Sequence, residues 1–145
     1  MECKITFSLV LESLVGDIGD DWEYSVQAKV FNPGLTGAGT IGIPEHQLAP
    51  GRSQPPPGAG QSVVIPAGAC GTGPRVELTV NATEVDWLID DHGSNVIVVP
   101  MECPGPGGPP FTIQPEISVV VRESPRFFGG SATLKVKVSL VAACV

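Results

Sequence analysis

Two short segments hold an unusual share of the chain's acidic side chains: residues 17–23 and 84–91 contain eight of the fifteen carboxylates. Like charges about 4 Å apart repel by roughly 4 kcal/mol at an effective dielectric near 20, so gathering them requires a cation or abundant water. Ca²⁺ takes six to eight hard oxygens, whereas Zn²⁺ would have only His92 as a nearby nitrogen ligand. The pattern therefore predicts a calcium site. Its expected ligands are Asp17, Asp20, Asp21, Glu84, Asp86, Asp90 and Asp91.

The alternation of side chains predicts an all-β fold. Apolar and polar residues alternate with a period of two in several segments, which is typical of strands with one buried face, and no segment carries a convincing helical stripe. One such face, that of residues 3–12, includes Leu11 and leaves Glu12 outside. We expect a single domain over residues 1–145, folded as an antiparallel Greek-key β-sandwich of about eight strands. The expected strands are 3–15, 22–31, 39–44, 62–67, 75–84, 94–100, 111–123 and 131–143.

The strand order predicts which loops meet. If consecutive strands are antiparallel, connections alternate between the two ends of the sandwich. One end then receives loops 16–21, 45–61, 85–93 and 124–130, which places both acidic segments together. His46 lies in the second of these loops without an evident partner. The other end receives both termini and loops 32–38, 68–74 and 101–110.

Two segments resemble the calcium loops of C2 domains. Residues 75–94, RVELTVNATEVDWLIDDHGS, end a strand in Glu84-x-Asp86, followed by a further aspartate before Gly93. Residues 9–30 are similar to the first C2 loop, with Asp17, then Asp20 or Asp21, and Tyr24 opening the next strand. The resemblance implies a C2-like sandwich that holds calcium between these loops. The chain departs from the family in having Glu-x-Asp rather than Asp-x-Asp and in lacking a basic lipid-binding strand.

The four cysteines are all expected at the end opposite the acidic loops. The first and last strands of sandwiches often lie side by side, so we favour a disulfide between Cys3 and Cys144, which leaves Cys70 with Cys103. Sequence alone cannot select among the three connectivities, and four reduced thiols are the alternative. The N-terminus lacks the apolar core of a secretory signal and no segment would span a membrane. These features favour the cytoplasm by default, and secretion if the cysteines are paired.

Composition narrows the class of function. A net charge of −7 with eight cations argues against nucleic-acid binding and against docking on anionic lipid by charge. We expect a non-catalytic binding or adaptor module, with Trp22, Trp87 and Phe127 as partner contacts. Trp87 would also suit membrane insertion, the less favoured outcome. We expect the last strand to lie at a sheet edge, where Lys135 and Lys137 would prevent pairing with another chain. This favours a monomer. The alternatives are a structural or interaction protein with a solvated acidic end and, less favoured, a hydrolase.

Overall fold

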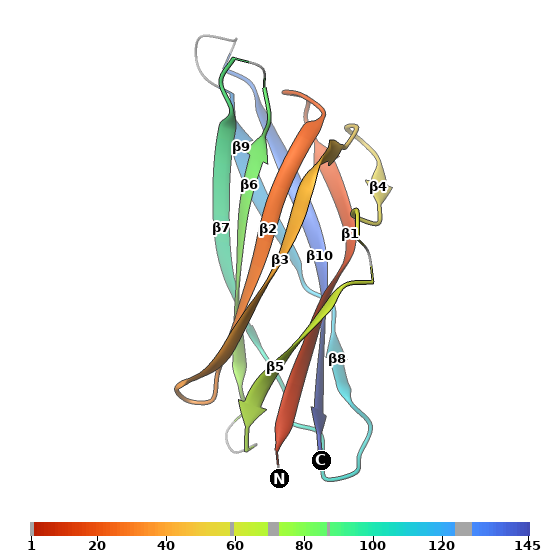
Figure 1. Cartoon of the computed structure of the whole chain (residues 1–145), viewed down its shortest axis with the longest axis vertical. Coiled ribbons are helices and arrows are strands. Elements are labelled where there is room, and N and C mark those ends of the chain that lie inside the picture. The colour runs from red at the N-terminus through yellow and green to blue at the C-terminus, as the bar shows by residue number, and fades with distance from the viewer. Residues whose placement is uncertain (1, 59, 70–72, 87, 124–128) are drawn as a thin grey trace.

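The computed structural model describes residues 2–58, 60–69, 73–86, 88–123 and 129–145, which form two antiparallel sheets (Figure 1). Sheet A contains β1 (Cys3–Val15), β4 (Ser53–Gln54), β5 (Ser62–Gly68), β8 (Phe111–Ile113), β9 (Glu116–Arg122) and β10 (Ser131–Cys144). Sheet B contains β2 (Asp21–Phe31), β3 (Leu35–Gln47), β6 (Arg75–Glu84) and β7 (Asp91–Pro100). The all-β sandwich is thus confirmed, while its Greek-key and C2-like details stay predictions.

The pairing pattern puts the chain's two ends beside each other. In sheet A, β1 and β10 form the centre, with β4 and β5 along the free side of β1 and β8 and β9 along the free side of β10. Sheet B has the order β3-β2-β6-β7. Lys135 and Lys137 therefore lie on an interior strand, so their role as edge protection was wrong and the argument from them for a monomer no longer holds.

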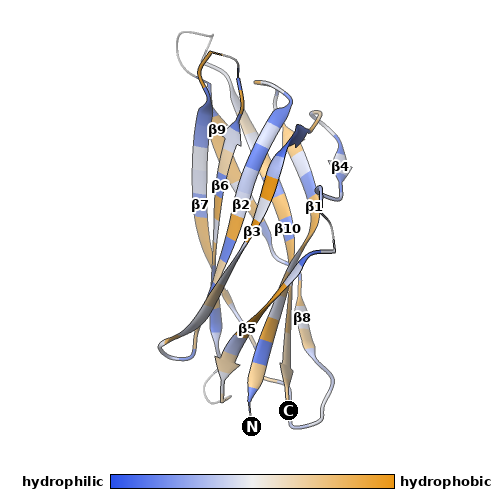
Figure 2. Cartoon of the chain, viewed as in Figure 1, coloured by the Kyte–Doolittle hydropathy of each residue, from blue (hydrophilic) through white to orange (hydrophobic). Residues whose placement is uncertain are grey.

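The core lies between the sheets and follows the predicted alternation. The inward side chains of β6 and β10 are almost all inaccessible, and hydropathy alternates in bands along strands such as β2 and β1 (Figure 2). Trp22 and Phe7 are the largest fully buried side chains. Fully burying such side chains stabilises the fold by about 1.5–3 kcal/mol each, before conformational entropy is counted.

One strand reverses its alternation part-way along. The register between β1 and β10 shifts between Leu9 and Leu11, as in a β-bulge. An extra residue moves every following side chain to the other face. Leu11 is consequently only half-buried and Glu12 is 0 % exposed, so the predicted orientation of both residues was wrong.

Strand boundaries differ from the prediction in several places. β3 begins earlier and ends later than the expected strand 39–44, and β7 begins earlier than the expected strand 94–100. The expected strand 111–123 is divided into β8 and β9 at Gln114 and Pro115, although both halves keep one register against β10. Pro115 has no N–H for the ladder, while its carbonyl still accepts a hydrogen bond from Val138 N at 2.9 Å. The loop expected over 45–61 also contains the short strand β4, which pairs with β1.

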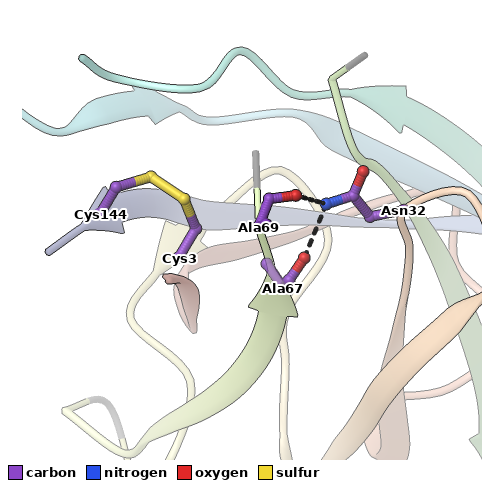
Figure 3. Close-up of a disulfide and its surroundings, with 5 residues drawn as sticks. All are labelled: Cys3, Asn32, Ala67, Ala69 and Cys144. Carbon is purple, nitrogen blue, oxygen red and sulfur yellow. Dashed lines mark hydrogen bonds between the residues drawn. A yellow bond between two sulfur atoms is a disulfide. The ribbon is translucent and has the colours of Figure 1, made fainter. Parts of the chain in front are cut away.

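The predicted disulfide between the first and last strands is confirmed. Cys3 and Cys144 are register partners and their sulfurs are bonded (Figure 3). Cys103 is also disulfide-bonded, while its expected partner Cys70 lies outside the described residues. Near the Cys3 bridge, Asn32 Nδ2 donates to the carbonyls of Ala67 and Ala69, both at 2.8 Å.

Candidate acidic site at one end of the sandwich

The two acidic segments meet at the end of the molecule opposite the termini (Figure 1). The β6–β7 loop is joined there to the start of β2 by a hydrogen bond from Val85 N to Asp21 O at 2.7 Å. The segment after β3 joins them through Leu48 N, which donates to Asp20 O at 2.7 Å. The parity argument therefore predicted correctly that these loops share one end.

Glu84 is the central side chain of this end. It is the last residue of β6, paired with Trp22 of β2 and Asp91 of β7, and all three positions are buried. Glu84 is 3 % exposed, and among the described residues its Oε2 atom has no hydrogen-bond partner. An unpartnered carboxylate oxygen in a buried position is energetically costly and requires a counter-charge, a proton or a ligand.

The surroundings of Glu84 favour its neutral form. Burial, together with the negative charges of Asp86, Asp91, Asp21 and Glu123, raises the pKa of the Glu84 carboxyl from 4.5 to about 7. Desolvation and like charges each disfavour the ionised carboxylate. Near neutral pH a proton therefore occupies this carboxyl about half of the time, unless a cation replaces it.

The loop that covers Glu84 depends on a glycine. Gly19 has φ of 146°, in a region that side-chain-bearing residues rarely adopt. A Cβ atom at Gly19 would collide with the Glu84 carboxylate. The Gly19 carbonyl also accepts a hydrogen bond from Trp22 Nε1 at 2.9 Å. Gly19 thus lets the backbone of the β1–β2 loop close over the acidic side chain.

The structure brings only part of the predicted ligand set together. Asp21, Asp86 and Asp91 surround Glu84 electrostatically, and Asp90 Oδ1 accepts a hydrogen bond from Asp86 N at 2.9 Å within the β6–β7 loop. Asp17 and Asp20 are exposed side chains of the β1–β2 loop. Over the described ranges, no group of three or more acidic, histidine or cysteine side chains already has a spacing suited to a metal ion.

Sequence reasoning missed one member of this site. Glu123 directly follows β9 and contributes to the raised pKa of Glu84. Its backbone N–H donates to Gly130 O at 2.7 Å, and a Cβ at Gly130 would lie 3.4 Å from the Glu123 carboxylate. The signal was available, because Glu123 immediately precedes a loop that parity had assigned to the acidic end.

The three residues expected to contact a partner are Trp22, Trp87 and Phe127, and the structure describes only the first of them. Trp22 is 0 % exposed and belongs to the core, so its assignment as a contact residue was wrong. Its indole packs inward because Trp22 shares the register row of Glu84 on the inner face of sheet B. Trp87 and Phe127 lie outside the described residues. Leu88 and Ile89, in the same loop as Trp87, are 55 % and 40 % exposed.

A second polar cluster is buried where the two sheets meet near β4. The Glu12 carboxylate accepts from Tyr24 OH at 2.7 Å, from Gln54 Nε2 at 2.9 Å and from His46 Nε2 at 2.7 Å. Burial, and then the charge of Glu12, raise the pKa of the Tyr24 hydroxyl above its ordinary range. The bulge in β1 creates this cluster by turning Glu12 inward, and simple alternation gives no sign of it.

Two hollows lined by described residues lie on the outer face of sheet B. The larger is a shallow groove of about 410 Å³ lined by Glu23, Ser25, Asn81 and Thr83 together with backbone and apolar neighbours. His92 lines the second hollow and its Nδ1 lies 3.0 Å from Thr83 Oγ1. His92 is exposed in this position, which is an ordinary surface environment for a histidine.

Comparison with protein-family models, with curated proteins and with solved structures finds no match to this chain. The part of the chain that the structure describes also contains no helix of the length and hydropathy that a membrane crossing requires.

Proposed function

We propose that the protein is a non-catalytic calcium-binding module whose ion is held between the β1–β2 and β6–β7 loops. The observation that carries the proposal is Glu84, a buried carboxylate with an unpartnered oxygen among other carboxylates. A hard divalent cation would neutralise these charges and supply the missing partner of Glu84 Oε2.

The ligands would come from both loops. Glu84, Asp86 and Asp91 would supply side-chain oxygens from the β6 and β7 side, and Asp21 would supply one from β2. The exposed carboxylates of Asp17, Asp20 and Asp90 are free of the core and would approach the ion as the loops close. Without the ion, repulsion among these carboxylates would loosen the loop side chains, although the loop backbones are already joined by hydrogen bonds.

Closure would present a defined surface at this end. Leu88 and Ile89 are exposed apolar side chains in the β6–β7 loop, next to Asp86 and Asp90. Adjacent exposed apolar side chains would contribute to a contact surface if the loop becomes ordered around them. Calcium-dependent ordering of this loop would therefore control binding of a partner, which makes the module an adaptor rather than an enzyme.

The disulfides suggest where this occurs. Cys3 is bonded to Cys144, and Cys103 is also disulfide-bonded. Such bonds persist in oxidising compartments and are rare in the cytosol. We therefore propose that the module works outside the cytosol, where calcium is abundant enough for a site of modest affinity.

Thermal unfolding with and without calcium tests the proposal. A ligand at one hundred times its Kd stabilises the native state by about 2.7 kcal/mol, so millimolar Ca²⁺ should raise Tm by roughly 5–10 °C relative to EGTA. Glu84→Gln should abolish the rise. Glu77→Gln, on the outer face of the same strand, should keep it. Mg²⁺ should act weakly because it requires a rigid octahedron.

A second candidate is a structural protein whose acidic end is only solvated. The exposure of Asp17, Asp20 and Asp90 favours it, because these side chains are already hydrated. In that case the wild type would have the same Tm in Ca²⁺ and in EGTA. The Tm of Glu84→Gln would also be the same in the two conditions.

A further inference from the structure

We infer that the outer face of sheet B binds a neutral oligosaccharide in a shallow trough that crosses its strands. The trough consists of the two adjoining hollows, of about 410 and 320 Å³, which share Asn81 and Thr83 as lining residues. The inference is independent of calcium binding, because these side chains point outward from β6 whereas Glu84 points inward.

The strand register arranges the polar side chains of the trough in two rows across sheet B. In one row Ser25 of β2 pairs with Asn81 of β6, which pairs with Ser94 of β7. In the next row Thr83 of β6 pairs with His92 of β7. Neighbouring strands lie about 4.8 Å apart, so the three intervals from β3 to β7 span about 14 Å. This length suits an oligosaccharide better than a single sugar ring.

The polar side chains in these rows are available to a ligand. Within the described part of the chain, those of Ser25, Asn81 and Ser94 make no hydrogen bond. His92 Nδ1 lies 3.0 Å from Thr83 Oγ1, which orients the imidazole and leaves its Nε2 without a partner among the same residues. Hydroxyl and amide groups both donate and accept hydrogen bonds, as the hydroxyls of a sugar do. The trough therefore matches a ligand that is covered with hydroxyl groups.

Gly42 of β3 keeps the trough open on one side. A Cβ at this position would meet nothing within 4 Å, and its φ is not in the left-handed region, so the fold does not require glycine here. By contrast, a Cβ at Gly37 or Gly39 of the same strand would collide with Ile65 or Val63 of β5. A glycine inside a strand often marks a place where a ligand approaches the backbone closely. The glycine at position 42 therefore points to an occupant of the trough.

The charges around the trough favour a neutral ligand. Among the described residues that line it, Glu23 is the one carboxylate, and none is a lysine or an arginine. Phosphate groups and nucleic acids are bound chiefly through such cations. The Glu23 carboxylate only accepts hydrogen bonds, which sugar hydroxyls donate readily.

The position of the trough in the sheet argues against an extended peptide. β2 and β6 are interior strands of sheet B, so their backbone groups pair with the strands on either side. Extended peptides bind most often by pairing with a free strand edge. Over β2 and β6 only side chains reach a ligand, and these would leave many N–H and C=O groups of a peptide unpaired.

Amide spectra of the nitrogen-15-labelled, oxidised chain in EGTA test the inference. The probes are cellotriose, maltotriose and tri-N-acetylchitotriose, each titrated to millimolar concentration. At least one should shift the signals of Ser25, Asn81, Thr83 and Ser94 to saturation and leave those of sheet A in place. Added NaCl should not weaken this binding, because salt does not screen a neutral ligand. The inference is overturned if no probe shifts these signals, or if a lysine-rich peptide shifts them and the sugars do not.

Matched variants locate the bound sugar. Asn81→Ala should weaken binding by about fivefold, as expected for the loss of a hydrogen bond. Thr79→Ala, on the same outer face of β6 but outside the trough, should bind as the wild type does. Gly42→Phe fills the trough and should abolish binding, with Tm in EGTA confirming that each variant is folded. Sugar binding that survives Gly42→Phe would overturn the inference. Glu84→Gln should bind the sugar normally, which separates this site from the calcium site.

Discussion

At the scale of single residues, Glu84 determines the chemistry of the acidic end. Its carboxyl group is buried beside four other carboxylates, and one of its oxygens finds no partner in the described part of the chain. Glu12 is equally buried, but its oxygens accept from Tyr24, His46 and Gln54. The two glutamates are both buried and differ in whether the described residues supply partners for their oxygens. An unsatisfied carboxylate leaves room for a proton or a cation, whereas a satisfied one supports the fold.

The raised pKa of Glu84 predicts how stability depends on pH without calcium. The unfolded carboxyl ionises near pH 4.5 and the folded one near 7, so this group's contribution is most favourable below pH 4.5 and is lost as pH rises to about 7. Above pH 7, the free energy of unfolding of Glu84→Gln should be about 3 kcal/mol higher than that of the wild type. Urea unfolding in EGTA from pH 4 to pH 8 measures this. If the free energy of unfolding depends on pH equally in both proteins, Glu84 is not the group with the raised pKa.

Calcium should displace the proton of Glu84. At pH 7 this group is about half protonated, and metal ligands must be deprotonated, so binding should release about half a proton per ion. Titration of CaCl₂ into the weakly buffered wild-type protein at pH 7 should lower the pH. The same titration of Glu84→Gln should leave the pH unchanged. Affinity should fall as the solution is acidified below pH 7. Binding without proton release would exclude Glu84 as a ligand.

At the scale of elements, the two sheets approach each other closely along the β7–β9 side. A Cβ at Gly93 of β7 would lie 2.5 Å from the carbonyl oxygen of Val120 of β9, and Asn95 Nδ2 donates to Ser118 O at 2.8 Å. A backbone atom cannot move aside as a side chain can. Glycine at position 93 therefore sets the distance between the sheets at this side.

Gly93→Ala should consequently destabilise the fold by about 1–3 kcal/mol, the usual cost of overpacking. The matched control is Gly42→Ala, on β3 of the same sheet, where a Cβ would meet nothing within 4 Å. That variant should be neutral or more stable by about 0.4–1 kcal/mol, because alanine restricts the unfolded chain. Urea unfolding of both variants gives the comparison, and an equal effect would refute the role of the close approach.

At the scale of the whole molecule, the sandwich has two different ends. The end with the termini is held by covalent bonds, since Cys3 and Cys144 are joined across a sequence separation of 141. The opposite end is held by a few backbone hydrogen bonds between loops that carry many negative charges. The two ends therefore differ in how they are held: one by a disulfide, the other by backbone hydrogen bonds between described loops.

Removing the terminal bridge tests how much of the stability it supplies. In the chain-entropy model a bridge of this span contributes on the order of 5 kcal/mol, so Cys3→Ser with Cys144→Ser should lower the free energy of unfolding by up to that amount. The acidic end lies at the far end of β1 from the bridge. The double variant should therefore keep the calcium-dependent rise in Tm under conditions in which it is folded. Unchanged unfolding would show that the pairing of β1 with β10 suffices.

The sequence by itself determined the all-β class, most strand positions and the meeting of the acidic loops, and it favoured the bridge between Cys3 and Cys144 without selecting it. Each of these follows from alternation and from the parity of antiparallel connections, which are local properties of the chain. Only the tertiary structure decided that Glu12 and Trp22 face inward, that Glu84 lacks a partner and that Glu123 joins it. A bulge depends on how two strands pair, and the burial of a residue at a strand end depends on which loops close over it, so neither is encoded in a single segment.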